Sequence, residues 1–150
     1  MSNNFAYRIK GGLPIRGEIE CLGAKNFATK AMVAAILGET PTTLTNVPPI
    51  GDIQITTEML TAIGATVSPV GEKTLHIDPS TIYQNEVPMA DSGSNRVPIL
   101  LLGALLHRFD SVSVPVLGGC KIGERKVDFH LEAIERFGGT VEIDEIGYHA

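Results

Sequence analysis

The sequence predicts an α/β fold built from a duplicated unit, and three observations support this prediction. First, a stretch beginning at Gly23 and a stretch beginning at Gly93 carry the same pattern of residues in the same order. Second, each stretch alternates helical apolar segments with short β-branched segments. Third, Gly64 and Gly138 close equivalent segments in the two copies, and glycine suits the position after a helix. One copy is too small to cover its own helices, so we expect the two copies to share a core.

The intervals between matched residues locate the part in which the two copies differ. Asn26 matches Asn95 at an interval of 69 residues, whereas Gly64 matches Gly138 at an interval of 74 residues. The second copy therefore contains five extra residues between its first strand and its second helix. These extra residues fall in or beside a segment that contains a cysteine, so the duplicated scaffold differs where reactive chemistry is expected.

Each copy is expected to contain a buried apolar helix, a strand, an amphipathic helix and further strand structure. The expected helices are 27–37 and 53–63 in the first copy, and 98–107 and 128–137 in the second. The expected strands are 17–21, 42–47, 65–70 and 74–78, then 111–116 and 140–146. In the last helix, Leu131 and Ile134 form an inward stripe with Val127 before it. This order predicts βαβαββ-type units with mixed sheets around buried helices.

The predicted division of the chain has three parts. Residues 1–21 form an N-terminal strand region, residues 22–90 the first repeat unit and residues 91–150 the second. The chain has 150 residues, of which 43% are hydrophobic, and this composition is sufficient for an ordinary packed core.

Composition excludes several classes of function. The net charge is −5 and Trp is absent, which argues against a nucleic-acid partner. The longest apolar run, Val97 to Leu106, is too short to span a membrane, and the N-terminus has no signal-peptide core. Cys21 and Cys120 are too few for a disulfide framework, although a single disulfide between them stays open. We expect a cytoplasmic protein with no membrane partner.

A cysteine loop, Gly118 to Asp128, is the first candidate site. It reads GGCKIGERKVD, and Lys121, Arg125 and Lys126 surround Cys120 with positive charge. Such charges stabilise a thiolate and also hold anionic substrates. The alternative is that Cys120 is a small, inert, buried residue, which is a common role for a free cysteine.

Two expected helix starts form the second candidate site. Gly23 and Ala24 precede Lys25 and Asn26 at the first apolar helix, where free backbone N–H groups and the helix dipole favour anions. The second copy supplies Asn95 and Arg96 at the equivalent place. We expect Lys25 and Arg96 to converge on one cleft and share an anion. The alternatives are that Lys25 is a solvated surface lysine and that Arg96 makes no contact with a helix end.

The histidines and cysteines form no metal site by their spacing. Neither cysteine has a CxxC partner, and no histidine pairs with a carboxylate at metal-ligand spacing. The histidines at positions 76, 107, 130 and 149 are therefore assigned no catalytic role, and no metal site is expected.

The motifs together resemble a known family. The segments GAKN, NRVPILLLGALLHRF and PVLGGCKIGERKVDFHLEAIERFGG are similar to those of the UDP-N-acetylglucosamine 1-carboxyvinyltransferases, the UDP-GlcNAc enolpyruvyl transferases of peptidoglycan synthesis. The resemblance implies an inside-out α/β barrel that is incomplete in this chain. It also implies transfer of the enolpyruvyl group from phosphoenolpyruvate to the 3-hydroxyl of UDP-N-acetylglucosamine, with release of phosphate, and it implies no metal or organic cofactor.

The resemblance also assigns roles to single residues. It implies that Lys25 and Asn26 contact phosphoenolpyruvate and the sugar, and that Arg96 helps to close the site. It implies that Cys120 donates a proton to the enolpyruvyl methylene carbon. The nucleotide segment is implied to be Arg125, Lys126, Val127, Asp128 and Phe129, with Lys126 standing where the family usually has proline.

Members of this family are longer, with a third copy of the unit and a second domain. We therefore expect the 150-residue chain alone to have little or no activity, and its N-terminal strand to lack sheet partners. Unpaired edges favour self-association. A non-catalytic binding or interaction module that retains the fold is the alternative function, and a nucleotide-binding protein of different chemistry is a third.

Overall fold

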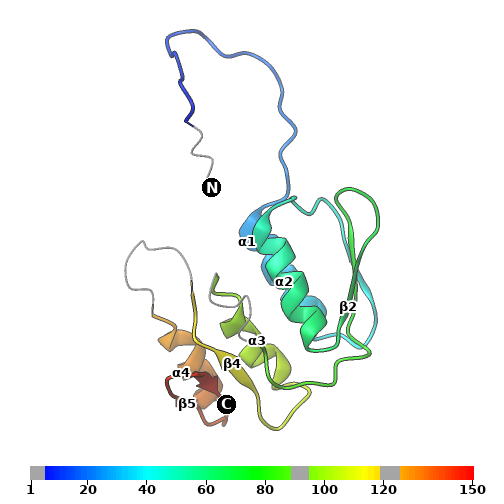
Figure 1. Ribbon diagram of the computed structural model, residues 1–150, viewed down its shortest axis with the longest axis vertical. Coiled ribbons are helices and arrows are strands. Elements are labelled where there is room, and N and C mark those ends of the chain that lie inside the picture. Colours follow the sequence, from blue (N-terminus) through cyan, green and yellow to red (C-terminus); the bar gives the residue numbers. More distant parts are fainter. Residues whose placement is uncertain (1–5, 89–94, 119–125) are drawn as a thin grey trace.

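The computed structural model describes residues 6–88, 95–118 and 126–150, and Figure 1 shows the arrangement of their elements. The first half contains α1 (Lys25–Ala35), β1 (Thr42–Leu44), α2 (Gly51–Ala62), β2 (Thr66–Pro69) and β3 (Leu75–Asp78). The second half contains α3 (Pro98–Leu105), β4 (Ser113–Pro115), α4 (Asp128–Arg136), β5 (Glu142–Ile143) and β6 (Gly147–His149). Among the described residues, no helix is long and apolar enough to cross a membrane.

The two halves have the same topology. Each contains a three-stranded sheet in which the last strand lies in the centre, with order β1-β3-β2 in one and β4-β6-β5 in the other. All pairs of these strands are antiparallel. Among the described residues, the expected mixed character is seen at a parallel bridge between Glu86 and Ser113, which joins the end of the first half to β4. The expected strand 140–146 is shorter than predicted: it contains β5 and a turn at Asp144, and β6 follows this turn and pairs with β5 as a hairpin.

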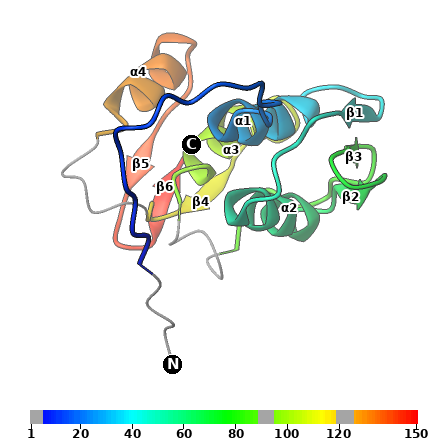
Figure 2. The same cartoon turned by 90° about the horizontal axis from the view of Figure 1, so that it is seen from above.

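The first helix of each half supplies the shared core. Met32 and Ile36 from the α1 region and Leu101, Leu102 and Leu105 of α3 are all fully buried. Figures 1 and 2 both show α1 and α3 side by side, with the two sheets on opposite sides of the pair. Arg108, just after α3, strengthens this contact. Its guanidinium donates hydrogen bonds to the backbone carbonyl groups of Ile36 and Gly38, which follow α1. The burial of apolar helices between the sheets follows from their composition.

Two expectations about exposure are wrong. α3 is buried on most sides, as predicted, but α1 leaves a face with Phe27, Lys30 and Ala34 open to solvent. Residues 17–21 do not form the expected strand; this segment and Cys21 are exposed, and no described residue pairs with them. A strand needs a neighbour to accept and donate its backbone hydrogen bonds, and the described part of the chain supplies none there.

Glycines end α2 and α4 in the same way, as the sequence predicts. Gly64 has φ of 102° and Gly138 has φ of 91°. Behind α2, the N–H of Ala65 donates to the carbonyl of Leu60, and behind α4 the N–H of Gly139 donates to the carbonyl of Ile134. These bonds satisfy carbonyl groups that a helix end would otherwise leave unpaired. The two glycines differ in their surroundings, since a Cβ at Gly64 would lie 2.5 Å from the ring of Tyr83, whereas a Cβ at Gly138 would have no neighbour within 4 Å.

We expect Gly64→Ala to lower the free energy of unfolding more than Gly138→Ala does. Both changes place an L side chain at positive φ, which costs about 1–2 kcal/mol, but only Gly64→Ala adds a clash with Tyr83 and with the carbonyl of Thr81. Urea unfolding of the two variants and the unsubstituted chain measures the difference. Equal losses would show that the packing around Gly64 is not as described.

Candidate active site

The N-terminal ends of all four described helices border one cavity of about 660 Å³. α1 contributes Lys25 and Asn26, and the first turn of α2 contributes Asp52. Arg96 lies just before α3, and Lys126 lies just before α4. None of these helices has a side-chain cap on its first turn from its N-cap residue. Unsatisfied N–H groups and the positive ends of helix dipoles therefore face a common space, which favours an anion.

The charged side chains around the cavity strengthen this preference. Its lining includes four cations, Lys25, Lys30, Arg96 and Lys126, against the single carboxylate of Asp52 among the described residues. The sign of the local charge is thus opposite to the net charge of −5 of the whole chain. A cleft lined by one sign of charge attracts ligands of the other sign and speeds their association.

Two contacts hold the cations in place. The ammonium group of Lys25 lies 2.9 Å from the carboxylate of Asp52, so that it is fixed between the starts of α1 and α2. The guanidinium of Arg96 donates to the backbone carbonyl of Lys126 across 3.4 Å. This second contact joins the start of α3 to the segment before α4. The two repeat units are therefore linked at the cavity itself.

Asn95 has an unusual position in the cavity wall. Its side chain is buried, with 7% of its surface exposed, and its Oδ1 accepts a hydrogen bond of 3.0 Å from the backbone N–H of Val97. Its Nδ2 is buried and has no hydrogen-bond acceptor among the residues that the structure describes. A buried donor left unpaired costs about 1–3 kcal/mol, so this group is a marked departure from ordinary protein interiors.

The structure brings together six of the residues singled out in the sequence and separates others. The six that line the cavity are Lys25, Asn26, Asn95, Arg96, Lys126 and Val127, which agrees with the expected convergence of the two helix starts. Val127 is buried, with 9% of its surface exposed.

The remaining predicted site residues either lie outside the cavity or fall outside the residues that the structure describes. Asp128 is the exposed first residue of α4, and neither it nor Phe129 lines the polar cavity. Phe129 is 80% exposed and borders a neighbouring apolar groove. Cys120 and Arg125 lie outside the described residues.

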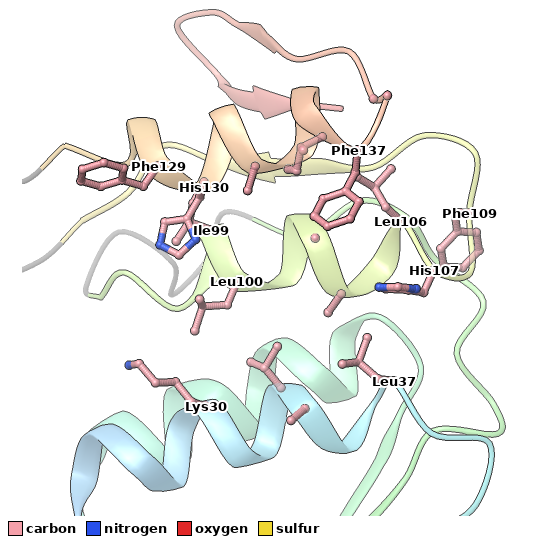
Figure 3. A pocket seen from close by; sticks show the side chains of 18 of the residues that line it. Lys30, Leu37, Ile99, Leu100, Leu106, His107, Phe109, Phe129, His130 and Phe137 are labelled. Atoms are coloured by element: carbon pink, nitrogen blue, oxygen red, sulfur yellow. The ribbon is translucent and has the colours of Figure 1, made fainter.

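The apolar groove lies between α1, α3 and α4 and has a volume of about 870 Å³. Figure 3 shows its walls, with Leu37 at the end of α1, Leu100 on α3 and Phe137 after α4. Phe137 is 95% exposed, and α4 has no fully buried residue. Lys30 and His130 line both the groove and the polar cavity, so the two spaces adjoin.

Sequence reasoning missed several residues of the cavity. Asp52 reads in the sequence as an acidic residue that complements the dipole of α2, and nothing in its spacing indicates a contact with Lys25. His130 was given no role, yet it lines the cavity from the first turn of α4. The position of His130 three residues after Val127 was the available signal, because residues three apart share a helix face.

The fold is a duplicated α/β unit with a cation-lined cavity, and comparison with a known structure shows the same fold. The structure is similar to the crystal structure of the enolpyruvyl transferase NikO from Streptomyces tendae, with a TM-score of 0.76 and 24% sequence identity. The similarity covers 93% of this chain and 30% of that one. At this level of identity, the comparison shows a common fold.

The family model of EPSP synthase (3-phosphoshikimate 1-carboxyvinyltransferase) matches residues 9–149. The chain therefore belongs to the EPSP synthase family. It is 41% identical over 137 residues to a UDP-N-acetylglucosamine 1-carboxyvinyltransferase from Protochlamydia amoebophila, and 45% identical over 138 residues to one from Chlamydia pneumoniae. These matches cover 90% and 91% of this chain. The chain spans about 30% of the length of these relatives. The resemblance read from the sequence is confirmed.

We expect Lys25 and Asp52 to be coupled by about 0.5–1 kcal/mol, as partly exposed ion pairs are. A double-mutant cycle of Lys25→Met and Asp52→Asn, measured by urea unfolding, gives this coupling energy. The exposed pair of Glu132 and Arg136 on α4 serves as the reference, with expected coupling of about 0.3–0.5 kcal/mol. Zero coupling between Lys25 and Asp52 would mean that the pair does not persist in solution.

Proposed function

We propose that this chain is part of a UDP-N-acetylglucosamine 1-carboxyvinyltransferase. The proposed reaction transfers the enolpyruvyl group of phosphoenolpyruvate to the 3-hydroxyl of UDP-N-acetylglucosamine and releases phosphate. Support comes from the names of the relatives that are about 40% identical to this chain. The observation that carries the proposal is the cavity at which four helix N-termini and four cations meet.

The chemistry of the cavity suits both proposed substrates. Phosphoenolpyruvate carries a phosphate and a carboxylate, and UDP-N-acetylglucosamine carries a diphosphate. Lys25 and Arg96 come from different repeat units but line the same space, so they can contact different oxygens of one anion. Fixed cations and helix N-termini also stabilise charge that develops when the phosphate leaves. We propose Asn26 as a further substrate contact beside Lys25.

In this proposal the cysteine loop supplies a proton. The oxygen of the sugar hydroxyl bonds to C2 of the enolpyruvyl group while Cys120 donates a proton to the methylene carbon. That carbon later returns a proton to the thiolate as the C2–O bond to phosphate breaks, which restores the double bond, and the proton of the hydroxyl leaves with phosphate. We propose that Arg125, Lys126, Val127, Asp128 and Phe129 form the segment that binds the nucleotide. These assignments rest on the resemblance of the motif GGCKIGERKVDF.

We propose that the complete enzyme adds a third repeat unit and a second domain to this part. The open face of α1 and the apolar groove beside α3 and α4 are the surfaces on which we place the third unit. Without it, these surfaces and the exposed N-terminal segment favour self-association of the chain. The proposed setting is peptidoglycan synthesis in the cytoplasm, in support of cell shape and division.

Alkylation of the two cysteines tests the proposed site. We expect fosfomycin and iodoacetamide to label Cys120 faster than Cys21, because the cations of its loop favour the thiolate. UDP-N-acetylglucosamine should change the rate at Cys120 and leave the rate at Cys21 unaltered. Peptide mapping by mass spectrometry measures both rates. Equal, slow labelling that ignores the nucleotide sugar would instead favour a binding module without catalytic function.

The 150-residue chain alone is expected to turn over little or no substrate. A cleft that aligns two substrates and excludes water needs walls on both sides, and this chain supplies one side. Phosphate release from phosphoenolpyruvate and UDP-N-acetylglucosamine measures turnover, and sedimentation velocity at the same concentrations monitors self-association. Robust turnover would show that the described cavity is a complete active site.

A further inference from the structure

Asn95 lines the cavity and carries a buried hydrogen-bond donor, Nδ2, for which the described residues supply no acceptor. Its Nδ2 is buried without an acceptor there, whereas its Oδ1 accepts from the N–H of Val97. This second bond fixes the orientation of the amide group. Reversing the amide would place Nδ2 against the N–H of Val97, so that two donors would face each other. The free N–H bonds of Asn95 therefore have a defined direction before any ligand arrives.

The surroundings of Asn95 indicate the kind of acceptor that it can take. The cavity that it lines is also bordered by Lys25, Arg96 and Lys126, and the start of α3 follows Asn95 directly. Lys25 is already paired with Asp52, and Arg96 already donates to the carbonyl of Lys126. The donor of Asn95 thus differs from these cations, because it is preoriented and has no described partner.

We propose that Asn95 is a binding residue whose Nδ2 donates a hydrogen bond to an anionic oxygen of the substrate, as found in phosphates and carboxylates. This inference rests on the proposed function, since it takes the cavity to be the anion-binding site. A bound oxyanion would accept from the donor for which the described residues supply no acceptor, so the cost of burying that donor is recovered on binding. A neutral, fixed amide also adds geometric selection, which mobile lysines supply less well.

Two variants of Asn95 separate its role as a donor from its structural role. Asn95→Asp keeps an oxygen for the N–H of Val97 and places a carboxylate at the start of α3, which the helix dipole favours. Asn95→Ser also keeps an acceptor for that N–H without adding charge. We expect both variants to fold with stability close to that of the unsubstituted chain. A purely structural asparagine would tolerate Asn95→Ser without loss of phosphate binding, whereas the negative charge of Asn95→Asp opposes an anion in either case.

The test is a titration of the ¹⁵N-labelled 150-residue chain and its variants with inorganic phosphate at constant ionic strength. We expect phosphate to bind about tenfold more weakly to Asn95→Ser, since a hydrogen bond to a charged group is lost, and more weakly still to Asn95→Asp. Thr140→Asp adds the same charge at an exposed position outside the cavity and should leave binding unchanged.

The side-chain amide signals of the unsubstituted chain provide a second measurement that does not depend on the folding of a variant. The NH₂ signals of Asn95 should shift on addition of phosphate, and those of Asn85, which donates to the carbonyl of Ser111, should not. If phosphate binds but neither the signals nor the Asn95 variants respond, the role of Asn95 is refuted and the proposed site stands. If phosphate does not bind to the unsubstituted chain at all, both proposals are overturned.

Discussion

The packing of α1 against α3 in one shared core is the constraint on which the cavity depends. Both helices bury large aliphatic side chains. They are also joined by Arg108, which follows α3 and donates a hydrogen bond to the carbonyl of Ile36 at the C-terminal end of α1. Because their N-terminal ends border the same cavity, equivalent helix starts of the two repeat units meet at one place. Duplication of a single helix start thereby produces a composite cavity, which neither unit would form by itself.

Charge at this composite site is organised by a small number of fixed contacts. Asp52 reduces the repulsion among the cations and at the same time holds Lys25 at the cavity. The contact between Arg96 and the carbonyl of Lys126 ties the second unit's two helix starts together. The unpaired amide of Asn95 is the exception in this network, and it is understandable if the pocket is built for an occupant.

The regular parts of the fold could be predicted because local rules determine them. The glycines that end α2 and α4 and the apolar composition of α3 leave little choice of structure. The errors arose where a partner decides the outcome. The N-terminal segment has the composition of a strand but no neighbour within the described chain, and only the family resemblance predicted that its sheet partners are missing. α1 was expected to be buried all round, yet Lys30 on its open face was an available signal that it is not.

The sequence by itself determined the family, through its motifs, and the duplication, and it predicted that Lys25 and Arg96 lie at one cavity. Motifs, repeat spacing and helix-start chemistry suffice for this, because they depend on residues near each other in the chain. Only the tertiary structure decided that Asp52 pairs with Lys25, that His130 reaches the cavity and that Nδ2 of Asn95 has no acceptor among the described residues. These features depend on distances between elements far apart in the chain, and a sequence pattern contains no record of which side chains such packing brings together.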